Sequence, residues 1–357
     1  MKKQIKIFTA LILLFALAVL PACEKNDHER SDTTQEKFSA YSFDYFDTVT
    51  TVTGYAESRE AFDKIANGIL AELEEYHRLF DIYHTYEGMN NIRTINEVTG
   101  GAHRTVTVDS RIIDMLLYAK EMYVVTGGKM NVAMGSVLSI WHEYRADGID
   151  DPDAAELPPT ARLLDAAEHM NIDAMVIDEA ACTVTLTDPK MKLDVGAVAK
   201  GYAVEMVVRS LEERGISGYV LNVGGNVRTV GTKPGGKYWT VGIEDPFGGD
   251  GYISYLALKG EAVVTSGDYQ RYYIVDGKKY HHVIDPETLM PSEGIVAVSV
   301  LTKDSAQGDA LSTALMCMSP EEGMALVRSL DGVEAQWVLP DGTLEASNGW
   351  ARYTIEK

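Results

Sequence analysis

Cysteine is scarce in this chain of 357 residues, with only three in the whole sequence. Cys23, Cys182 and Cys317 form no Cys-x-x-Cys pair and have no histidine at ligand spacing, which argues against a zinc site. Cys182 lies in a strand-like run and Cys317 in an apolar helical one. We therefore expect both in the core, and the sequence leaves a disulfide between them open.

Basic residues are also few. Lysine and arginine together number 32 against 53 aspartates and glutamates, which gives a formal net charge of −21. Such an acidic chain is a poor partner for nucleic acid or anionic lipid, so we predict no nucleic-acid partner. An anionic ligand would need local help from cations, from a helix dipole or from a metal ion.

Long hydrophobic runs are limited to Phe8–Leu20, which follows a lysine-rich start. This run is too short for a comfortable membrane span and is typical of an export signal. It ends in Leu20-Pro21-Ala22-Cys23, which resembles the bacterial lipobox, where the cysteine is lipidated and becomes the first residue. A plain signal peptide with a chance cysteine is the alternative interpretation.

These features divide the chain into three parts. We predict a lipoprotein signal peptide over 1–22, a lipidated Cys23 with a polar tether over 23–37, and one folded domain over 38–357. The protein is then expected to be exported and lipid-anchored on the outer, extracytoplasmic face of the bacterial cell membrane.

Hydrophobic periodicity predicts both helices and strands. Apolar residues recur every three or four positions from 62 to 80, which predicts a long amphipathic helix. Alternation over Tyr41–Tyr55 predicts one strand. Further helices are expected over 111–125, 132–145, 160–170, 305–318 and 320–330, short strands near 175–178 and 183–187, strands with tight turns from 219 to 300, and a closing hairpin through 340–342. Because strands and helices come in clusters, the pattern favours an α+β fold with mainly antiparallel sheet.

The segment Lys192–Glu205 is the most informative stretch. A short apolar run ends in Asp194, and small residues lead into a helical pattern that Gly215 ends. Such a helix N-terminus can present free N–H groups to an anion, and Gly196–Val198 and Lys200 are candidates to hold phosphate oxygens. An ordinary strand-to-helix turn is the alternative.

A second segment surrounds Asp309. On a helix, Asp309 and Thr313 share one face, with Ser312 adjacent, so carboxylate and hydroxyl oxygens could reach one hard cation such as Mg²⁺. Capping by Asp309, with Thr313 bonded back to the helix, is the alternative.

Three further motifs carry weaker signals. His282 stands before Asp285-Pro286 and could act as a general base, or be an ordinary strand residue. The segment Thr265–Arg271 could orient a phosphate or merely form a turn. The paired glycines within Val220–Asn226 are a weak nucleotide signature, because their spacing is not the dinucleotide fingerprint.

Five motifs in order are more specific than any one of them. They are Asp-x-Gly-Ala-x-Ala-Lys-Gly-Tyr-Ala-Val at 194–204, Asn-x-Gly-Gly-Asn at 222–226, Thr-Ser-Gly-Asp-Tyr at 265–269, His-x-Ile-Asp-Pro at 282–286 and Gly-Asp-Ala-Leu-Ser-Thr-Ala at 308–314. This series resembles the ApbE family, the FAD:protein FMN transferases, over nearly all of the chain after the tether.

The resemblance implies an α+β, T-fold-like architecture and a Mg²⁺-dependent enzyme. Such an enzyme binds FAD as substrate, transfers its FMN half to a threonine or serine of a target protein and releases AMP. Members of the family commonly modify acceptor subunits of membrane redox complexes that carry covalent FMN. Two alternatives stay open: hydrolysis of FAD to FMN and AMP, and a lipid-anchored flavin- or solute-binding protein without chemistry.

The resemblance also assigns residues. Asp309, Thr313, Ser312 and the carbonyl of Ala197 match metal ligands, and His282 and Asp309 match catalytic positions. Flavin contacts fall on Phe46, Tyr83, Lys129, Met130, Asn131, Asp194, Lys200 and Ala297.

The chain departs from the family pattern at three places. Asn131 stands where the family usually has aspartate, Phe46-Asp47-Thr48 replaces Met-Gly-Thr, and Leu289 replaces a glycine. These changes affect flavin packing and loop shape more than the metal ligands.

Overall fold

The computed structural model describes residues 35–98, 104–249 and 251–356. The expected signal peptide, Cys23 and most of the tether therefore lie outside the described residues. Within those ranges, every helix is too short or too polar to cross a membrane.

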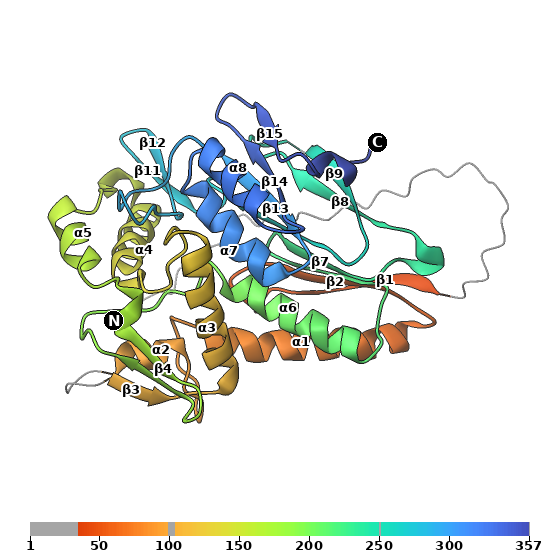
Figure 1. Cartoon of the computed structure of the whole chain (residues 1–357), viewed down its shortest axis with the longest axis horizontal. Helices are drawn as coiled ribbons and strands as arrows, with labels where there is room; N and C mark the ends of the chain where they lie inside the picture. Colours follow the sequence, from red (N-terminus) through yellow and green to blue (C-terminus); the bar gives the residue numbers. More distant parts are fainter. Residues whose placement is uncertain (1–34, 99–103, 250, 357) are drawn as a thin grey trace, which may run out of the picture. The chain divides into compact units, whose positions relative to one another are not determined.

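An eight-stranded sheet forms the centre of the described chain (Figure 1). Every neighbouring pair in it is antiparallel, which confirms the predicted sheet type. In spatial order its strands are β1 (Glu36–Ser42), β2 (Thr50–Ala56), β6 (Tyr219–Val223), β7 (Asn226–Val230), β10 (Ala262–Gly267), β13 (Ala297–Thr302), β14 (Glu334–Val338) and β15 (Leu344–Ala346).

Four helices pack on this sheet: α1 (Arg59–Phe80), α6 (Ala199–Glu213), α7 (Ser305–Met316) and α8 (Pro320–Ser329). Helices α1 and α6 run side by side, and α7 lies on β10 and β13 (Figure 1). Their apolar stripes, such as Phe62 and Leu73 of α1, form one core with sheet residues such as Val300. The hairpin of β8 (Trp239–Glu244) and β9 (Tyr252–Leu258) forms a separate apolar cluster with Val263 and Leu301.

The remaining elements flank these layers. A small sheet has the order β3 (Arg104–Thr107), β5 (Thr183–Leu186) and β4 (Met175–Asp178), and α2 (Ile92–Glu97) and α3 (Ser110–Val125) accompany it. Helices α4 (Gly135–Asp150) and α5 (Thr160–Ala167) pack with the hairpin of β11 (Tyr272–Val275) and β12 (Lys278–His281). Four single 3₁₀ turns occur in the described chain: η1 (Pro152–Ala154), η2 (Ile172–Ala174), η3 (Pro234–Gly236) and η4 (Trp350–Arg352).

Two predictions of secondary structure need correction. Tyr41–Tyr55 is not one strand but parts of β1 and β2, because Phe46 and Asp47 adopt left-handed φ values of 55° and 51° and turn the chain back. The helix expected over 132–145 begins at Gly135 and ends at Asp150. The N–H of Gly135 donates to the Lys192 carbonyl, so the start of α4 is tied to the neighbouring segment and residues 132–134 are not part of the helix.

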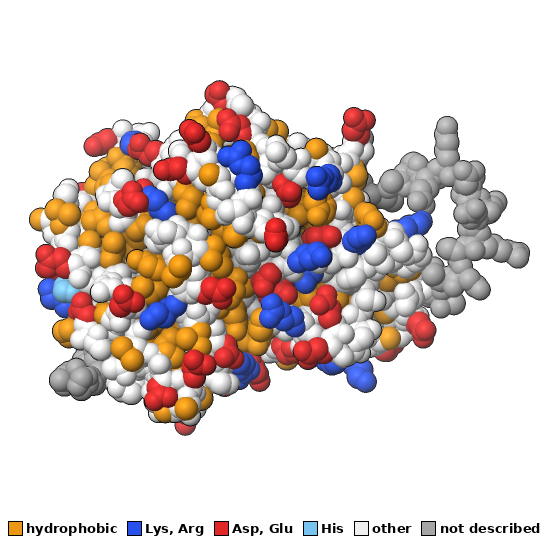
Figure 2. Space-filling model, viewed as in Figure 1, with side chains coloured by type: hydrophobic (Ala, Val, Ile, Leu, Met, Phe, Trp, Pro, Cys, Tyr) orange, Lys and Arg blue, Asp and Glu red, His pale blue; other side chains and the backbone are white. Residues whose placement is uncertain are grey.

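Cys182 and Cys317, the two cysteines within the described residues, are free thiols, so the disulfide between them that the sequence left open is not formed. Cys317 is buried as expected, whereas Cys182 lies in the turn before β5 with a φ of 49° and is partly exposed. On the face drawn in Figure 2, acidic, basic and apolar side chains are interspersed.

Candidate functional site

The crossing of α6 and α7 places Asp309 beside the start of α6. The two helices approach closely because Gly201 lacks a side chain: a Cβ there would lie 2.3 Å from the Ser305 carbonyl oxygen and 2.5 Å from Cβ of Asp309. Asp309 is 2% exposed. Its Oδ1 lies 2.9 Å from Nζ of Lys200, and its Oδ2 accepts from the N–H of Gly201 at 2.8 Å. A buried carboxylate is thus held by one cation and one amide.

Two of the other expected metal ligands, Ser312 and Thr313, follow Asp309 on α7. Thr313 follows Asp309 by one helical turn and is half-buried, whereas Ser312 is buried. The Ser312 hydroxyl donates to the Asp309 carbonyl at 3.0 Å and lies 2.8 Å from the Ser266 hydroxyl. Ala197 stands in the turn just before α6. This donor set contains only carboxylate, hydroxyl and carbonyl oxygens, which is the chemistry that Mg²⁺ prefers, so the residues present fit that ion.

The turn before α6 is fixed by its own hydrogen bonds. The N–H of Gly196 donates to Oδ1 of Asp194 at 2.9 Å, and the N–H of Val198 donates to the Val195 carbonyl at 3.0 Å. Asp194 is in turn tied to the segment before α4, since its N–H donates to the Val132 carbonyl at 2.8 Å. Two of the amides expected to hold phosphate are therefore already engaged within the chain.

His142 of α4 connects Asp194 to Tyr83. Its Nε2 lies 3.7 Å from Oδ2 of Asp194, and its Nδ1 lies 3.4 Å from the Tyr83 hydroxyl. Burial holds the pKa of His142 below its usual value, although the Asp194 charge favours the protonated form. A neutral imidazole can donate from one nitrogen and accept at the other, which suits a position between a carboxylate and a phenol. Burial, with Asp194 next, raises the pKa of Tyr83 to about 12, so the phenol stays protonated.

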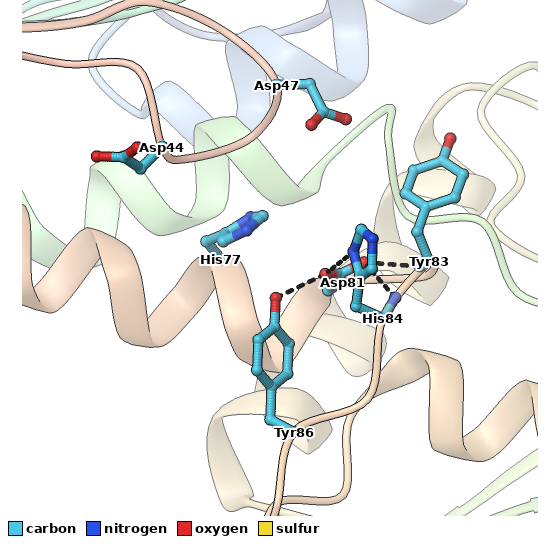
Figure 3. Close-up of a pocket in the computed structure, with 7 residues that line it drawn as sticks. All are labelled: Asp44, Asp47, His77, Asp81, Tyr83, His84 and Tyr86. Carbon is cyan, nitrogen blue, oxygen red and sulfur yellow. Dashed lines mark hydrogen bonds and ion pairs between the residues drawn. The ribbon is translucent and has the colours of Figure 1, made fainter. Parts of the chain in front are cut away.

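Tyr83 also lines a pocket of about 410 Å³ at the end of α1 (Figure 3). Asp81, buried at the base of the Tyr83 loop, accepts from the N–H of Tyr83 at 2.6 Å and from the Tyr86 hydroxyl at 2.8 Å. Burial opposes its ionisation, but these hydrogen bonds, with others from His84, lower the pKa of Asp81 overall. The fixed loop leaves the Tyr83 side chain 50% exposed, and its ring is available to a planar ligand. The pocket is lined by Asp44, Asp47, His77, Asp81, Tyr83, His84 and Tyr86.

His282 follows β12 and lies near several cations. Its Nδ1 is buried and has no hydrogen-bond partner among the described residues. Burial, followed by the charges of Arg271 and Arg145, lowers the pKa of His282 to about 3. The imidazole is therefore neutral at physiological pH and has a nitrogen free to accept a proton. The adjacent His281 has a structural role, since its Nε2 lies 2.8 Å from the Ser292 carbonyl.

Other expected flavin contacts have structural partners. Lys129 lies 3.1 Å from both Asp285 and Glu287, and Met130 is 1% exposed in the core. The Asn131 amide donates to the Met170 carbonyl and accepts from the N–H of Ala133. These three side chains hold a turn, and their contact with flavin stays a prediction.

Two more of these residues lie on the strands or their connections. The Phe46 ring packs against His77, a residue of the Tyr83 pocket, with ring centroids 5.4 Å apart. Ala297 is buried on β13 opposite Gly267 of β10. A flavin contact by either residue likewise stays a prediction.

The sequence did not predict two residues near Tyr83 as members of the site. His142 and Arg145 lie three residues apart on α4, and only the structure shows that this face points to Asp194 and Tyr83. A usable signal was their position beside the apolar stripe of Val137, Ile140 and Trp141, because polar residues flanking a buried stripe lie at its edge.

Comparison with known proteins identifies the family of this chain. The model of the ApbE family matches residues 46–337, which is most of the chain. The chain belongs to the ApbE family. It is 32% identical over 270 residues to an FAD:protein FMN transferase of Klebsiella pneumoniae, with 73% of this chain and 81% of the relative covered. It is 33% identical over 269 residues to the FAD:protein FMN transferase of Treponema pallidum, with 72% of this chain and 73% of that relative covered.

Solved structures of the ApbE family share the fold. The crystal structure of the ApbE protein of Thermotoga maritima has a TM-score of 0.77 at 26% identity, covering 90% of this chain and 100% of the other. The flavin transferase ApbE of Vibrio cholerae has a TM-score of 0.74 at 23% identity, covering 89% and 99%. The expected ApbE-like α+β fold is thereby confirmed.

Two departures from the ApbE pattern have a common backbone feature. Asp47 and Leu289, which stand where the pattern has glycine, adopt φ values of 51° and 61°. Glycine reaches this left-handed region without steric cost, whereas other residues do so rarely. Both turns therefore keep a glycine-like backbone although the glycine itself is gone.

Proposed function

We propose that this protein transfers the FMN half of FAD to a threonine or serine hydroxyl of a target protein and releases AMP. The observation that carries the proposal is the buried Asp309 at the crossing of α6 and α7, in a chain similar to two FAD:protein FMN transferases over most of their length. We further propose that Mg²⁺ is required, with Asp309, Thr313, Ser312 and the Ala197 carbonyl as its ligands.

The side chains have separable tasks in this reaction. When bound, Mg²⁺ neutralises diphosphate charge and polarises the phosphoryl oxygens. His282 accepts the proton of the acceptor hydroxyl as that oxygen attacks the FMN phosphorus, and AMP departs with the bridging oxygen. Tyr83 offers its exposed ring to the flavin, and the Asp81 hydrogen bonds hold the Tyr83 loop in place.

The location of the reaction follows from the N-terminal sequence. We propose that the chain is exported, is lipidated at Cys23 and acts at the outer face of the bacterial cell membrane. Its acceptors would then be subunits of membrane redox complexes that expose the hydroxyl on that side.

The first prediction tests the carboxylate. Asp309→Asn keeps the shape of the side chain but removes its charge, and we expect Mg²⁺-dependent AMP release to fall by about a hundredfold or more. The assay incubates the full-length protein in detergent with FAD, Mg²⁺ and an acceptor protein, and follows AMP together with acceptor mass. The matched control is Asp63→Asn, whose carboxylate is exposed on α1.

Two results would contradict these assignments. Unchanged turnover of Asp309→Asn would refute the metal assignment. AMP release without any gain of acceptor mass would show FAD hydrolysis instead of transfer, and bound but unconsumed FAD with a proven acceptor present would exclude both reactions.

A further inference from the structure

Two arginines near Tyr83, Arg145 and Arg271, have no carboxylate partner among the described residues. Arg145 projects from α4 one turn after His142, and Arg271 precedes β11, a strand that packs on α4. A guanidinium nitrogen of Arg271 donates to the carbonyl of Asp47 at 3.3 Å. Asp47 and Tyr83 line the same pocket, and His142 contacts the Tyr83 hydroxyl, so α4 and the start of β11 meet at the edge of that pocket.

The absence of an ion pair at these two arginines, within the described part of the chain, is unusual for such a strongly acidic protein. Within the described residues, neither Arg145 nor Arg271 lies within ion-pair distance of a carboxylate, although Asp194 is close enough to influence Arg145. Burial and the positive charge of Arg271 together lower the pKa of Arg145, in spite of Tyr83 and Asp194, so the two guanidiniums repel one another. Arginines elsewhere pair with acids, among them Arg59, Arg93, Arg111, Arg162, Arg209, Arg214 and Arg228.

The same two charges act on His282. They are the strongest electrostatic influences on that imidazole, whose buried Nδ1 has no partner within the described chain. Two guanidiniums and an unbonded imidazole nitrogen thus surround one region from α4, the start of β11 and the segment after β12. Like charges held together without a counter-ion are unfavourable unless an anion joins them.

Three of the groups expected to hold phosphate, all near the start of α6, are engaged elsewhere. The amides of Gly196 and Val198 bond within their own turn, and the Lys200 ammonium lies on Asp309. A phosphoryl group near His282 therefore needs other donors. Guanidinium groups suit this task, because their planar fork matches the geometry of phosphate oxygens.

We propose that Arg145 and Arg271 form a guanidinium pair that binds the phosphoryl group joined to the flavin, the group that FAD gives to the acceptor. The proposal rests on the proposed function and adds to it a subsite formed by residues outside the metal ligands.

In the transfer, the bond from the acceptor oxygen to phosphorus forms and the bond from phosphorus to the bridging oxygen of AMP breaks. The AMP leaves with the bridging oxygen, and the acceptor proton passes to His282. The arginines stabilise the charge on the two non-bridging oxygens of the transferred phosphoryl group.

The test compares two ligands that differ by one phosphate, FMN and riboflavin. Binding to the full-length protein is followed by flavin fluorescence in EDTA without acceptor, so that neither turnover nor Mg²⁺ contributes. We expect the unaltered protein to bind FMN more tightly than riboflavin. Arg145→Gln and Arg271→Gln should each reduce this preference by about tenfold or more, with riboflavin affinity unchanged.

Two further variants control the result. Arg162→Gln removes an exposed guanidinium that pairs with Glu143 of α4, and the preference for FMN should survive it. Arg145→Lys keeps the charge but loses the fork, and should restore part of the preference that Arg145→Gln loses. Thermal unfolding of each variant identifies any that has failed to fold.

Three outcomes would overturn the subsite. The first is equal affinity of the unaltered protein for both ligands. The second is a parallel loss of FMN and riboflavin binding in the variants, which would indicate a role in supporting the flavin ring or the fold. The third is an unchanged preference for FMN in both arginine variants, which would show that neither guanidinium contacts the phosphate of the flavin. Because the measurement needs no transfer, the subsite and the transferase activity can fail independently.

Discussion

At the scale of single residues, the candidate site contrasts two buried ionisable groups. The Asp309 carboxylate is enclosed by Lys200 and the Gly201 amide, whereas His282, whose pKa is lowered, is kept neutral by burial and by the charges of Arg271 and Arg145. Charged groups in low dielectric need partners, and a group without a partner loses its charge instead. In the proposed reaction, the carboxylate would hold the cation and the neutral imidazole would take up the proton.

The pKa of His282 predicts a stability that depends on pH. Its folded value of about 3 lies below the value near 6.5 of an exposed histidine, so the unfolded chain binds a proton in this interval that the folded chain does not. Stability should therefore fall as the pH is lowered from 7 towards 4. His282→Gln should weaken this dependence, measured as the free energy of unfolding in urea at pH 7.5 and pH 4.5. His84→Gln, which removes an exposed imidazole, is the control, and an identical dependence in His282→Gln and the unaltered protein would refute the assignment.

At the scale of elements, the crossing of α6 and α7 decides the geometry of the site. Gly201 permits the close approach on one side of α7, and Gly308 permits it on the other, where a Cβ would lie 2.8 Å from Cγ2 of Val264 on β10. Helix α7 is thus held between α6 and the sheet by two glycines. Its position fixes Asp309, which lies next to Gly308 in the chain.

We predict that Gly201→Ala destabilises the protein by about 1–3 kcal/mol, because the added methyl group meets the Ser305 carbonyl and the Asp309 side chain. Urea unfolding measures this change. Gly68→Ala on α1 is a suitable control, since its Cβ enters open space and the substitution should stabilise the helix by roughly 0.5–1 kcal/mol. Equal stability of Gly201→Ala and the unaltered protein would show that the helices can separate without cost.

Elements with a strong local pattern were predictable from the sequence, whereas contacts between distant segments were not. The stripe from Phe62 to Phe80 predicted α1, and Asp276-Gly277 predicted the β11–β12 turn, where both residues have positive φ. The two strands within Tyr41–Tyr55 were missed because the turn between them uses Phe46 and Asp47 at backbone angles typical of glycine.

The candidate site was predictable only in part for the same reason. Asp309 and Lys200 stood out within their own motifs, but their 2.9 Å contact joins residues far apart in the chain. The place of His142 depends on the bond between Asp194 and Val132 that brings α4 to the α6 turn. No local pattern contains such a bond.

At the scale of the whole molecule, the described domain begins with β1, whose strand is fully paired with β2 from Glu36 onwards. Most of the predicted tether therefore precedes the first element that the structure describes. A chain that starts at residue 35 should keep its fold and its transfer activity. The proposed export signal and lipidated Cys23 would then serve location alone.

Because the segment that contains Cys23 precedes the folded domain, we predict that Cys23 is needed for membrane attachment but not for activity. Cys23→Ser should abolish incorporation of labelled fatty acid and release the protein from the membrane fraction, while AMP release in detergent stays the same. Cys182→Ser is the matched control and should keep the label, since Cys182 lies within the folded domain. Labelling that persists in Cys23→Ser would disprove the lipoprotein assignment.

The contact between Lys200 and Asp309 has a consequence for the metal site proposed above. The Lys200 ammonium gives the buried carboxylate a counter-charge in the folded chain. If Mg²⁺ binds at Asp309 as proposed, it would share Oδ1 with this ammonium or take its place, and a displaced ammonium would become available to another anion. Folding would then not wait for the ion, and competition with the lysine would weaken the affinity for the metal.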